Sequence, residues 1–256
     1  MTDNILETRN LVKEFRGFVA VNDVSLNIRR HDIHALIGPN GAVKTTFFNL
    51  LTKFLIPTKG SITYNGVDIT SEKPAQTARR GLVRSFQISA VFPHMTALEN
   101  VRVALQRKLP TSFHFWKSGQ SLASLHDRAM ALLGEVGLTD FAEVLAVELA
   151  YGRKRALELA TTLALEPELM LLDEPTQGMG HEDVAQVAQL IKKVSANRTI
   201  LMVEHNMSVV SSIADTITVL QRGAVIAEGP YAVVSKDPLV VEAYMGSTSE
   251  ELQGAH

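Results

Sequence analysis

The sequence contains no cysteine, which excludes disulfide bonds and thiolate metal sites. It also lacks any apolar run approaching the ~18–20 residues that a membrane-spanning helix needs. Its first residues show no basic segment followed by an apolar one, so we expect no secretory signal peptide. We therefore expect a chain that is soluble by itself and that reaches a membrane only through a partner.

A strong charge of either sign is lacking as well, because the formal net charge of the 256 residues is −2. Lysine and arginine are scattered along the chain, so we expect no nucleic-acid partner. Hydrophobic residues make up 46% of the sequence and charged residues 20%, which provides for a packed core and argues against disorder. This length permits one large α/β domain or two small ones.

The chain is organised around residues 33–46, where an apolar run precedes a glycine-rich turn and Lys44-Thr45-Thr46. Apolar residues then recur at helical spacing as far as Phe54. A strand, a glycine-rich loop, Lys-Thr and a helix make the phosphate-binding loop architecture, whose backbone N–H groups converge on an anion. Lys44 would neutralise the β- and γ-phosphates, and the Thr45 hydroxyl would coordinate Mg²⁺. The residues assigned to nucleotide binding are Gly38, Pro39, Asn40, Gly41, Ala42, Val43, Lys44, Thr45 and Thr46.

Val43 occupies a position where this motif normally has glycine. Glycine suits the position because the backbone approaches a phosphate closely, often with restricted dihedral angles. Valine brings a branched side chain with two methyl groups and is stiff about its first torsion. Taken alone, the motif therefore leaves a purely structural strand-to-helix turn open as the alternative.

Other local patterns outline the elements around this loop. Alternating apolar and polar residues within 5–30 predict a half-buried antiparallel strand. Residues 61–69 predict a β-hairpin with a type I′ turn, and residues 216–227 predict a second hairpin near the end of the chain. Between them, a mainly helical block includes a polar and aromatic stretch at residues 108–120, whose role the sequence does not decide.

Two further apolar runs, residues 169–172 and 199–203, have the character of strands buried on both faces. The first run ends in Asp173-Glu174, and the second is followed closely by His205. Parallel pairing would bring these groups to the same sheet edge as the glycine-rich loop. Each group has a plainer alternative, since an acidic pair can simply end a strand and a lone histidine is usually a satisfied residue. Their joint occurrence in this order favours a site.

We assign catalytic roles to Glu174, His205 and Gln87. Glu174 would polarise the attacking water, and His205 would hydrogen-bond the γ-phosphate. Asp173 would hold Mg²⁺ through a water molecule, as the acidic residue after a hydrophobic strand does in P-loop NTPases. Gln87 would bridge the Mg²⁺ ion and the γ-phosphate, so the predicted metal site consists of Thr45, Gln87 and Asp173.

On these motifs the sequence resembles an ATPase subunit of an ABC transporter, and the resemblance covers essentially the whole chain. The motifs fall in the order and rough spacing of that family: Gly38–Thr45, Ser85–Gln87, Leu149–Arg153, Leu169–Glu174 and Val203–His205. Finer details are closer to the subfamily that serves branched-chain amino acid importers, with urea and amide importers as near neighbours. Those details lie in residues 83–87, 149–153, 173–179, 203–207 and 237–246.

The resemblance implies an α/β fold, with a P-loop NTPase core around a mainly parallel sheet. It also implies an N-terminal antiparallel β subdomain and a helical subdomain inserted at about residues 92–165. Together these make one ABC ATPase domain over residues 5–247, followed by a C-terminal tail of residues 248–256. The cofactors that the resemblance implies are ATP and Mg²⁺.

The resemblance further implies a dimer in which two such subunits sit head to tail with two ATP molecules between them. The second subunit is either the same chain or a sibling. The signature residues, which act on the ATP held by the partner, are Leu149, Ala150, Tyr151, Gly152 and Arg153. Phe15 matches the aromatic residue that stacks on adenine. The region after Gln87, including Phe92, matches the groove that receives a short helix from a transmembrane permease subunit.

The same resemblance implies a transport system with a separate solute-binding protein. The ATPase subunit of such a system is peripheral and lies at the cytoplasmic face of the cell membrane. On this mechanism the ATPase subunit never touches the cargo, so the amino-acid assignment depends on the resemblance alone.

Other positions besides the valine of the loop depart from the family pattern. Ala150 replaces a serine, so a hydrogen bond to the γ-phosphate and a helix N-cap are both missing. Tyr151 and Arg153 replace glycine and glutamine, which matters less because the glycine between them remains. Gly180 stands where many relatives have an aspartate that communicates across the dimer.

Several functions stay open at this point. The first is an ATP-hydrolysing motor subunit of an amino-acid importer, and the second is a docking subunit whose nucleotide site is impaired by Val43 and Ala150. A third keeps the motor and changes the cargo to urea, amides or an exported lipid. Intact Glu174 and His205 favour the motor, because a subunit that does not hydrolyse ATP has no chemical need for either side chain. Slow turnover or weak ATP affinity remains open for that motor.

Overall fold

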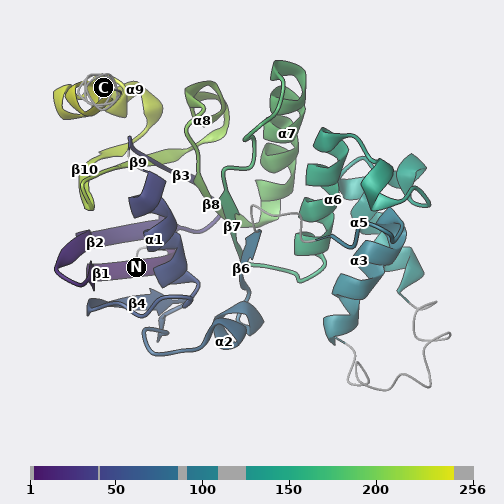
Figure 1. Ribbon diagram of the computed structural model, residues 1–256, viewed down its shortest axis with the longest axis horizontal. Helices are drawn as coiled ribbons and strands as arrows, with labels where there is room; N and C mark the ends of the chain where they lie inside the picture. Colours follow the sequence, from purple (N-terminus) through teal and green to yellow (C-terminus); the bar gives the residue numbers. More distant parts are fainter. Residues whose placement is uncertain (1–2, 40, 86–90, 109–124, 245–256) are drawn as a thin grey trace.

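Two β-sheets form the frame of the molecule in the computed structural model, which describes residues 3–39, 41–85, 91–108 and 125–244 (Figure 1). The smaller sheet has the strand order β2-β1-β4-β5, and all its pairs are antiparallel. Its strands are β1 (Asn4–Phe15), β2 (Phe18–Arg29), β4 (Lys59–Tyr64) and β5 (Val67–Asp68). The alternation predicted in residues 5–30 is confirmed, because Val24, Leu26 and Ile28 of β2 are buried while the residues between them are exposed.

The larger sheet has the strand order β10-β9-β3-β8-β7-β6. Its strands are β3 (Ile33–Ile37), β6 (Leu82–Ser85), β7 (Leu169–Asp173), β8 (Thr199–Val203), β9 (Thr216–Gln221) and β10 (Ala224–Gly229). Every pair is parallel except the final hairpin of β9 and β10. The three strands predicted from apolar runs, β3, β7 and β8, are buried along their whole length. The expected α/β class with a mainly parallel sheet is therefore confirmed.

The larger sheet separates two hydrophobic cores, which makes the molecule layered (Figure 1). Alternate residues of β8 illustrate the division. Leu201 and Val203 pack with helix α1 (Gly41–Leu51) and the smaller sheet. Ile200 and Met202 pack in the second core, to which α7 (His181–Val194) and α8 (Met207–Ile213) contribute.

The helical pattern after the glycine-rich loop starts earlier and ends sooner than the sequence predicted. Helix α1 begins at Gly41 rather than Lys44, and it ends at Leu51. Lys53 has a left-handed backbone with φ of 64°, a conformation that commonly terminates helices. Phe54 therefore lies beyond the helix, where 55% of the residue is exposed.

A group of helices lies at one end of the molecule, beyond β6 and β7 (Figure 1). It contains α3 (Ala97–Leu105), α5 (His126–Glu135) and α6 (Tyr151–Leu163), which contact one another. Short 3₁₀ turns connect them: Gln106–Lys108, Thr139–Phe141 and Ala146–Glu148. The described residues also contain α2 (Pro74–Arg79), α9 (Tyr231–Val234) and a short helix over residues 238–244. Among the helices of the described ranges, none has the length and apolarity to cross a bilayer.

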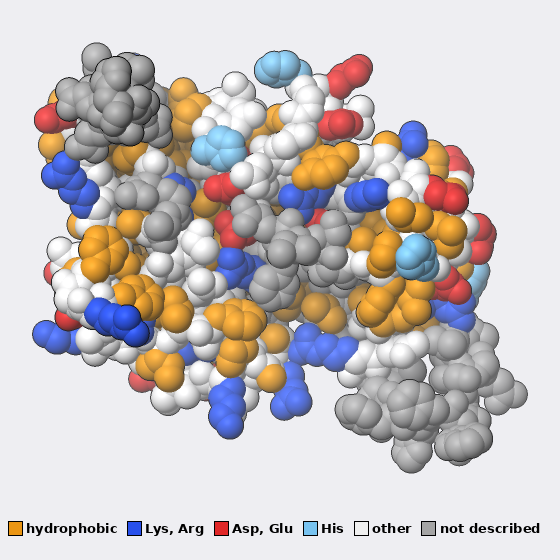
Figure 2. All heavy atoms as spheres, in the orientation of Figure 1, with side chains coloured by type: hydrophobic (Ala, Val, Ile, Leu, Met, Phe, Trp, Pro, Cys, Tyr) orange, Lys and Arg blue, Asp and Glu red, His pale blue; other side chains and the backbone are white. Residues whose placement is uncertain are grey.

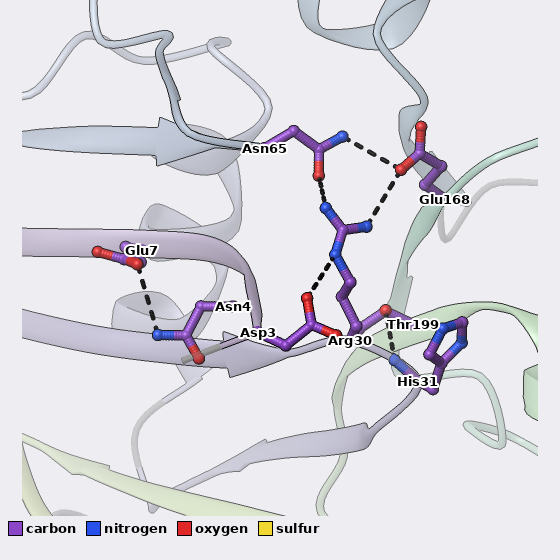
Figure 3. Close-up of polar contacts among 8 residues, drawn as sticks. All are labelled: Asp3, Asn4, Glu7, Arg30, His31, Asn65, Glu168 and Thr199. Carbon is purple, nitrogen blue, oxygen red and sulfur yellow. Dashed lines mark hydrogen bonds and ion pairs between the residues drawn. The ribbon is translucent and has the colours of Figure 1, made fainter. Parts of the chain in front are cut away.

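The two sheets are fastened together by Arg30, which follows β2 (Figure 3). Its guanidinium lies 2.9 Å from Asp3, 3.3 Å from Glu168 and 2.5 Å from the side-chain oxygen of Asn65. Asn65 belongs to the turn between β4 and β5, whereas Glu168 directly precedes β7. This cluster therefore joins the smaller sheet to the amino ends of the parallel strands, and it leaves their carboxyl ends free for a site.

Candidate active site

Three neighbouring parallel strands bring the predicted functional groups to one edge of the larger sheet (Figure 1). β8 pairs with β3 on one side and with β7 on the other. The chain leaves β3 at Gly38, β7 at Asp173 and β8 just before His205. In the space-filling view, acidic and basic side chains lie side by side near the middle of the face, where β7 and β8 run (Figure 2). The common edge that parallel pairing predicted is thus present.

Lys44 is buried and folds back over the glycine-rich loop. Its Nζ donates a hydrogen bond to the backbone oxygen of Gly38 at 2.5 Å. Burial lowers the pKa of Lys44, while the charges of Glu174 and Asp173 act in the opposite direction. The ammonium therefore lies within electrostatic reach of both carboxylates, at the place where phosphate charge would be neutralised.

Gly38 is required by the close approach of two strands at the start of the loop. A Cβ atom at this position would lie 2.0 Å from the backbone oxygen of Leu220 in β9, and φ is 150°. Any side chain would therefore force β3 and β9 apart, just where the loop begins.

Val43 lies on the core side of α1 rather than over the loop. Its side chain is buried in the hydrophobic cluster that also contains Leu36, Phe47 and Phe48. Val43 is not among the residues with a left-handed backbone, so its β-branched side chain meets no backbone strain of that kind. The structure thus gives the valine a packing role that the motif alone does not indicate.

The other loop residues occupy the junction of β3 and α1. Asn40 lies outside the described residues, and Gly41 and Ala42 form the start of α1. Pro39 is half-buried, Thr46 is half-buried, and Thr45 is exposed.

The chain offers oxygen ligands of the kind that Mg²⁺ prefers. Thr45 supplies a hydroxyl from the second turn of α1, and Asp173 supplies a carboxylate at the end of β7. No group of three or more histidine and carboxylate side chains that could hold a metal exists within the described ranges. A magnesium ion bound together with a nucleotide needs only one or two protein ligands, because phosphates and water provide the rest. The donor set therefore fits magnesium nucleotide rather than a free-standing metal centre.

Asp173 forms a buried ion pair with Arg84 of β6, through its Oδ2 and the guanidinium Nη2. The other terminal nitrogen of Arg84 donates to the side-chain oxygen of Asn49 in α1 at 2.6 Å. The guanidinium also lies 5.7 Å from the centre of the Phe48 ring. Arg84 therefore joins β6, β7 and α1 and fixes the orientation of the carboxylate. Truncating one partner of such a buried pair leaves the other charge uncompensated.

Glu174 and His205 face each other from neighbouring loops. His205 Nδ1 lies 4.0 Å from Glu174 Oε1, and their side chains are 60% and 19% exposed. Glu174 has a left-handed backbone with φ of 46°, and its N–H donates to the oxygen of Val203 at 2.9 Å. The structure therefore brings together the carboxylate and the imidazole to which catalytic roles were assigned. Gln87, the third of these residues, lies outside the described part of the chain.

The five signature residues span the N-terminus of α6, on the other side of β7 and β8 from α1 (Figure 1). Leu149 is buried before the helix, and Ala150 occupies the N-cap position with extended dihedral angles. Alanine has no side-chain oxygen with which to accept a hydrogen bond from the first turn. The N-terminal N–H groups of α6 therefore lack the side-chain acceptor that serine would supply.

Tyr151 and Arg153 make contacts that the sequence did not predict. The Tyr151 hydroxyl donates to the backbone oxygen of Gln177, in the loop after β7, at 3.0 Å. The Arg153 guanidinium lies 3.9 Å from the centre of the Phe141 ring. A Cβ at Gly152 would lie 2.9 Å from a carboxylate oxygen of Asp183 in α7, so the Asp183 side chain would have to shift to admit one. Tyr151 therefore has a structural role that its sequence position did not indicate, because its hydroxyl joins the N-terminus of α6 to the loop that begins with Glu174.

Phe15 ends β1 and presents its ring to solvent, with 41% of the residue exposed. The Nζ of Lys13 lies 5.0 Å from the ring centre. Phe18, its strand partner across the turn, is also exposed. An exposed aromatic ring beside a cation is a suitable stacking surface for a planar base.

Sequence reasoning assigned no role to Arg84 or Glu204, although both sit next to predicted site residues. Arg84 was visible as a cation inside a short strand between apolar and polar residues, and a buried cation needs an acidic partner. Glu204 was visible as a carboxylate directly after a fully buried strand, and it is 0% exposed in the structure. The signal in both cases is a charged residue at a position whose neighbours are buried.

Comparison with known proteins matches this chain to two families. The ABC transporter model matches residues 21–177, and the model of the branched-chain amino acid ATP-binding cassette transporter matches residues 224–249. The high-affinity branched-chain amino acid transport ATP-binding protein BraF of Pseudomonas aeruginosa is 40% identical over 253 residues. That alignment covers 96% of this chain and 99% of BraF.

Solved structures of ATP-binding cassettes have the same fold. The ADP conformation of one cassette of an ABC transporter superposes with a TM-score of 0.84 at 30% identity, covering 95% of this chain and 99% of that one. A dimeric cassette in a post-hydrolysis state, bound to ADP and phosphate, gives a TM-score of 0.72 at 25% identity. It covers 88% of this chain and 98% of that one.

Proposed function

This chain belongs to the ABC transporter family of ATP-binding subunits, and from that membership we propose that it drives an importer of branched-chain amino acids. It is an ATPase by family. The observation that carries the proposal is the gathering of Lys44, Asp173, Glu174 and His205 at one sheet edge. The intact Glu174 and His205 pair argues against a docking subunit without catalysis, and the likeness to BraF favours amino acids over urea, amides or lipids.

In the proposed reaction, water attacks the γ-phosphorus of ATP and ADP leaves. Lys44 would neutralise the phosphate oxygens, and the N–H groups at the start of α1 would bind them. Glu174 would accept a hydrogen bond from the attacking water and orient its lone pair toward phosphorus. His205 would donate a hydrogen bond to the γ-phosphate from the opposite loop.

Mg²⁺ would supply charge neutralisation to the β- and γ-phosphates when bound with the nucleotide. Thr45, Asp173 and Gln87 are the residues that we assign to it, Asp173 through a water molecule. Arg84 holds the Asp173 carboxylate from the side of β6, which would leave Oδ1 available. Phe15 would stack on the adenine.

We propose a head-to-tail dimer for the closed state, with this chain or a sibling as the second subunit. Residues Leu149–Arg153 would approach the nucleotide held by the partner, so that the N-terminus of α6 meets the γ-phosphate. ATP would then stabilise the closed dimer, and hydrolysis would remove the group that bridges the two subunits. The dimeric cassette bound to ADP and phosphate provides a fold-level precedent.

We propose that the permease docks at a cavity of about 250 Å³ between β6, α3 and α6. Phe92 and Val103 line it with apolar surface, and Asn100 lines it with an amide. Asn100 also fixes Phe92, accepting a hydrogen bond from its N–H at 2.7 Å and donating one to its oxygen at 3.1 Å. A short amphipathic helix of a transmembrane subunit would fit such a surface. The chain would thereby be peripheral at the cytoplasmic face of the membrane, in a system with a separate solute-binding protein.

The proposed mechanism is tested by Glu174→Gln, which keeps the shape of the side chain and removes the charge that activates water. We expect ATP hydrolysis to fall by about 10²-fold or more, while ATP traps the variant as a stable dimer in light scattering. Glu182→Gln, an exposed carboxylate in the first turn of α7, is the matched control and should hydrolyse ATP normally. A Glu174→Gln protein that stays monomeric at saturating ATP would contradict the head-to-tail dimer.

The cargo is tested by reconstituting the chain in proteoliposomes with its own permease and solute-binding protein. Leucine, isoleucine or valine should raise the ATPase rate and be taken up with ATP. Stimulation by urea or amides alone would overturn the amino-acid assignment while leaving the ATPase intact.

A further inference from the structure

Glu204 is a fully buried carboxylate whose two oxygens serve two different loops. Oε1 accepts hydrogen bonds from the N–H of Thr176 at 3.1 Å and from its hydroxyl at 2.5 Å. Oε2 accepts hydrogen bonds from the N–H groups of His205 and Asn206, both at 3.0 Å. A buried charge is costly unless it is hydrogen-bonded, and here four donors meet that demand.

The two loops joined in this way carry the facing groups of the site. The loop after β7, residues 174–180, begins with Glu174, whose left-handed backbone is costly for a residue with a side chain. Thr176 lies two residues further along and is held at both its backbone and its hydroxyl. On the other side, Asn206 caps α8 by accepting hydrogen bonds from Ser208 and Val209. The second loop is therefore fixed by α8 as well as by Glu204.

We propose that Glu204 is a positioning residue for ATP hydrolysis, which holds Glu174 and His205 at a fixed separation on either side of the γ-phosphate. This inference depends on the function proposed above, because it assigns a use to the distance between those two side chains. Glu204 itself is fully buried, so its side chain is closed off from solvent. It acts through the two loops, so that a displacement of one loop is transmitted to the other.

The symmetry of the carboxylate explains why glutamine cannot replace it. An amide has one accepting oxygen and one NH₂ group that only donates. With glutamine at position 204, one loop would keep its acceptor while the two donors of the other loop would face the NH₂ group. Displacements of about 1 Å in a catalytic arrangement can reduce a rate by about 10²-fold. The loss should therefore fall on the catalytic step rather than on nucleotide affinity.

The test compares Glu204→Gln, Thr176→Val and Thr176→Ser in the full-length protein, by steady-state ATP hydrolysis and by calorimetry of Mg-ATP binding. We expect Glu204→Gln to lower kcat by ten- to a hundredfold while the Kd for Mg-ATP changes by less than about threefold. Thr176→Val, which removes only the hydroxyl donor, should lower kcat less, and Thr176→Ser should restore it. Glu228→Gln is the matched control, since Glu228 accepts a hydrogen bond from Thr218 at 2.8 Å on β10 and lies outside these loops.

A double-mutant cycle separates positioning from general stability. Glu204→Gln should lower kcat much less in a His205→Ala background than in the wild-type chain, because one of the two positioned groups is already absent. An equal fold-loss of kcat in both backgrounds would overturn the proposal. So would a Glu204→Gln protein with a lower melting temperature and an unchanged kcat. If the wild-type chain does not hydrolyse ATP, the proposed function fails. Hydrogen exchange of residues 174–180 then still tests whether Glu204 fixes this loop. If it does, the backbone amides of residues 174–180 should exchange faster in Glu204→Gln.

Discussion

At the scale of single residues, Val43 is the position where the sequence and the structure give different expectations. The motif predicts that glycine would bind phosphate better, because valine crowds the loop. The structure places the valine side chain in the core beside Phe47, where its methyl groups contribute to packing. The same side chain therefore has a stability role, and the test must separate that role from nucleotide binding.

We expect Val43→Ala to lower the free energy of unfolding by about 2 kcal/mol, because it removes two buried methyl groups. The affinity for Mg-ATP should stay within about twofold, since the side chain points to the core. Urea unfolding and calorimetry measure the two quantities. Val24→Ala in β2, buried in the same cluster, is the matched control for the stability loss. A tenfold gain in ATP affinity for Val43→Ala or Val43→Gly would show that the valine does crowd the phosphate, as the motif alone predicts.

At the scale of elements, the N-terminus of α6 lacks a side-chain cap. Ala150 has the extended backbone of an N-cap residue and no polar side chain to complete it. A serine at an N-cap stabilises a helix by about 1 kcal/mol relative to alanine. The same hydroxyl would point toward the nucleotide of the partner subunit in the proposed dimer.

Ala150→Ser should therefore raise the free energy of unfolding by about 1 kcal/mol and also strengthen ATP-dependent dimerisation. Thermal unfolding without nucleotide measures the first effect, and light scattering of the Glu174→Gln background with ATP measures the second. Ala185→Ser, on the exposed face of α7, controls for helix propensity and should cost a few tenths of a kcal/mol instead. A gain in stability without any gain in dimerisation would place Ala150 away from the partner's nucleotide.

The buried strands of the larger sheet were predictable because each has a local signal in the sequence. Continuous apolar runs indicated β3, β7 and β8, and parallel pairing then placed Gly38, Asp173 and His205 at one edge. The contacts of Arg84 were not predictable, because they join three elements that no single stretch of sequence relates. The same limit applies to Tyr151, whose partner is a backbone oxygen in another loop.

The start of α1 was misplaced for a different reason. The lysine and threonines mark the chemistry of the loop, whereas the helix begins three residues earlier at Gly41. Glycine is a poor helix former, so propensity gave no reason to include it. Packing of Val43 into the core supplies the missing stabilisation, and packing cannot be read from propensity.

At the scale of the whole molecule, a buried histidine makes the free energy of unfolding depend on pH. His34 lies in β3, with Nε2 2.8 Å from the hydroxyl of Thr218, which itself donates to Glu228. Because the single hydroxyl proton of Thr218 goes to Glu228, Nε2 of His34 is the donor in the first bond. Burial lowers the pKa of His34 from its ordinary value of 6.5 to about 4.

The sign of the effect follows from proton binding. Between pH 6.5 and pH 4 the unfolded chain takes up a proton at this histidine and the folded chain does not, so stability falls as the pH falls. We expect a loss of roughly 3 kcal/mol across this window, and no further loss from this residue below it. Urea unfolding at pH 7, 6, 5 and 4 measures the slope in wild type and in His34→Gln, which should be flatter. His94→Gln, at an exposed position, should keep the wild-type slope, and a His34→Gln slope equal to wild type would refute the assignment.

The place of β3 in the larger sheet has a consequence for synthesis of the protein. Within the described ranges, residues 33–37 pair with residues 200–203 on one side and with residues 216–219 on the other. A chain emerging from the ribosome therefore exposes this apolar strand and the loop behind it until most of the sequence has been made. The edge proposed to bind nucleotide should be the last part of the fold to close, and a nascent chain truncated before β8 should have no affinity for ATP.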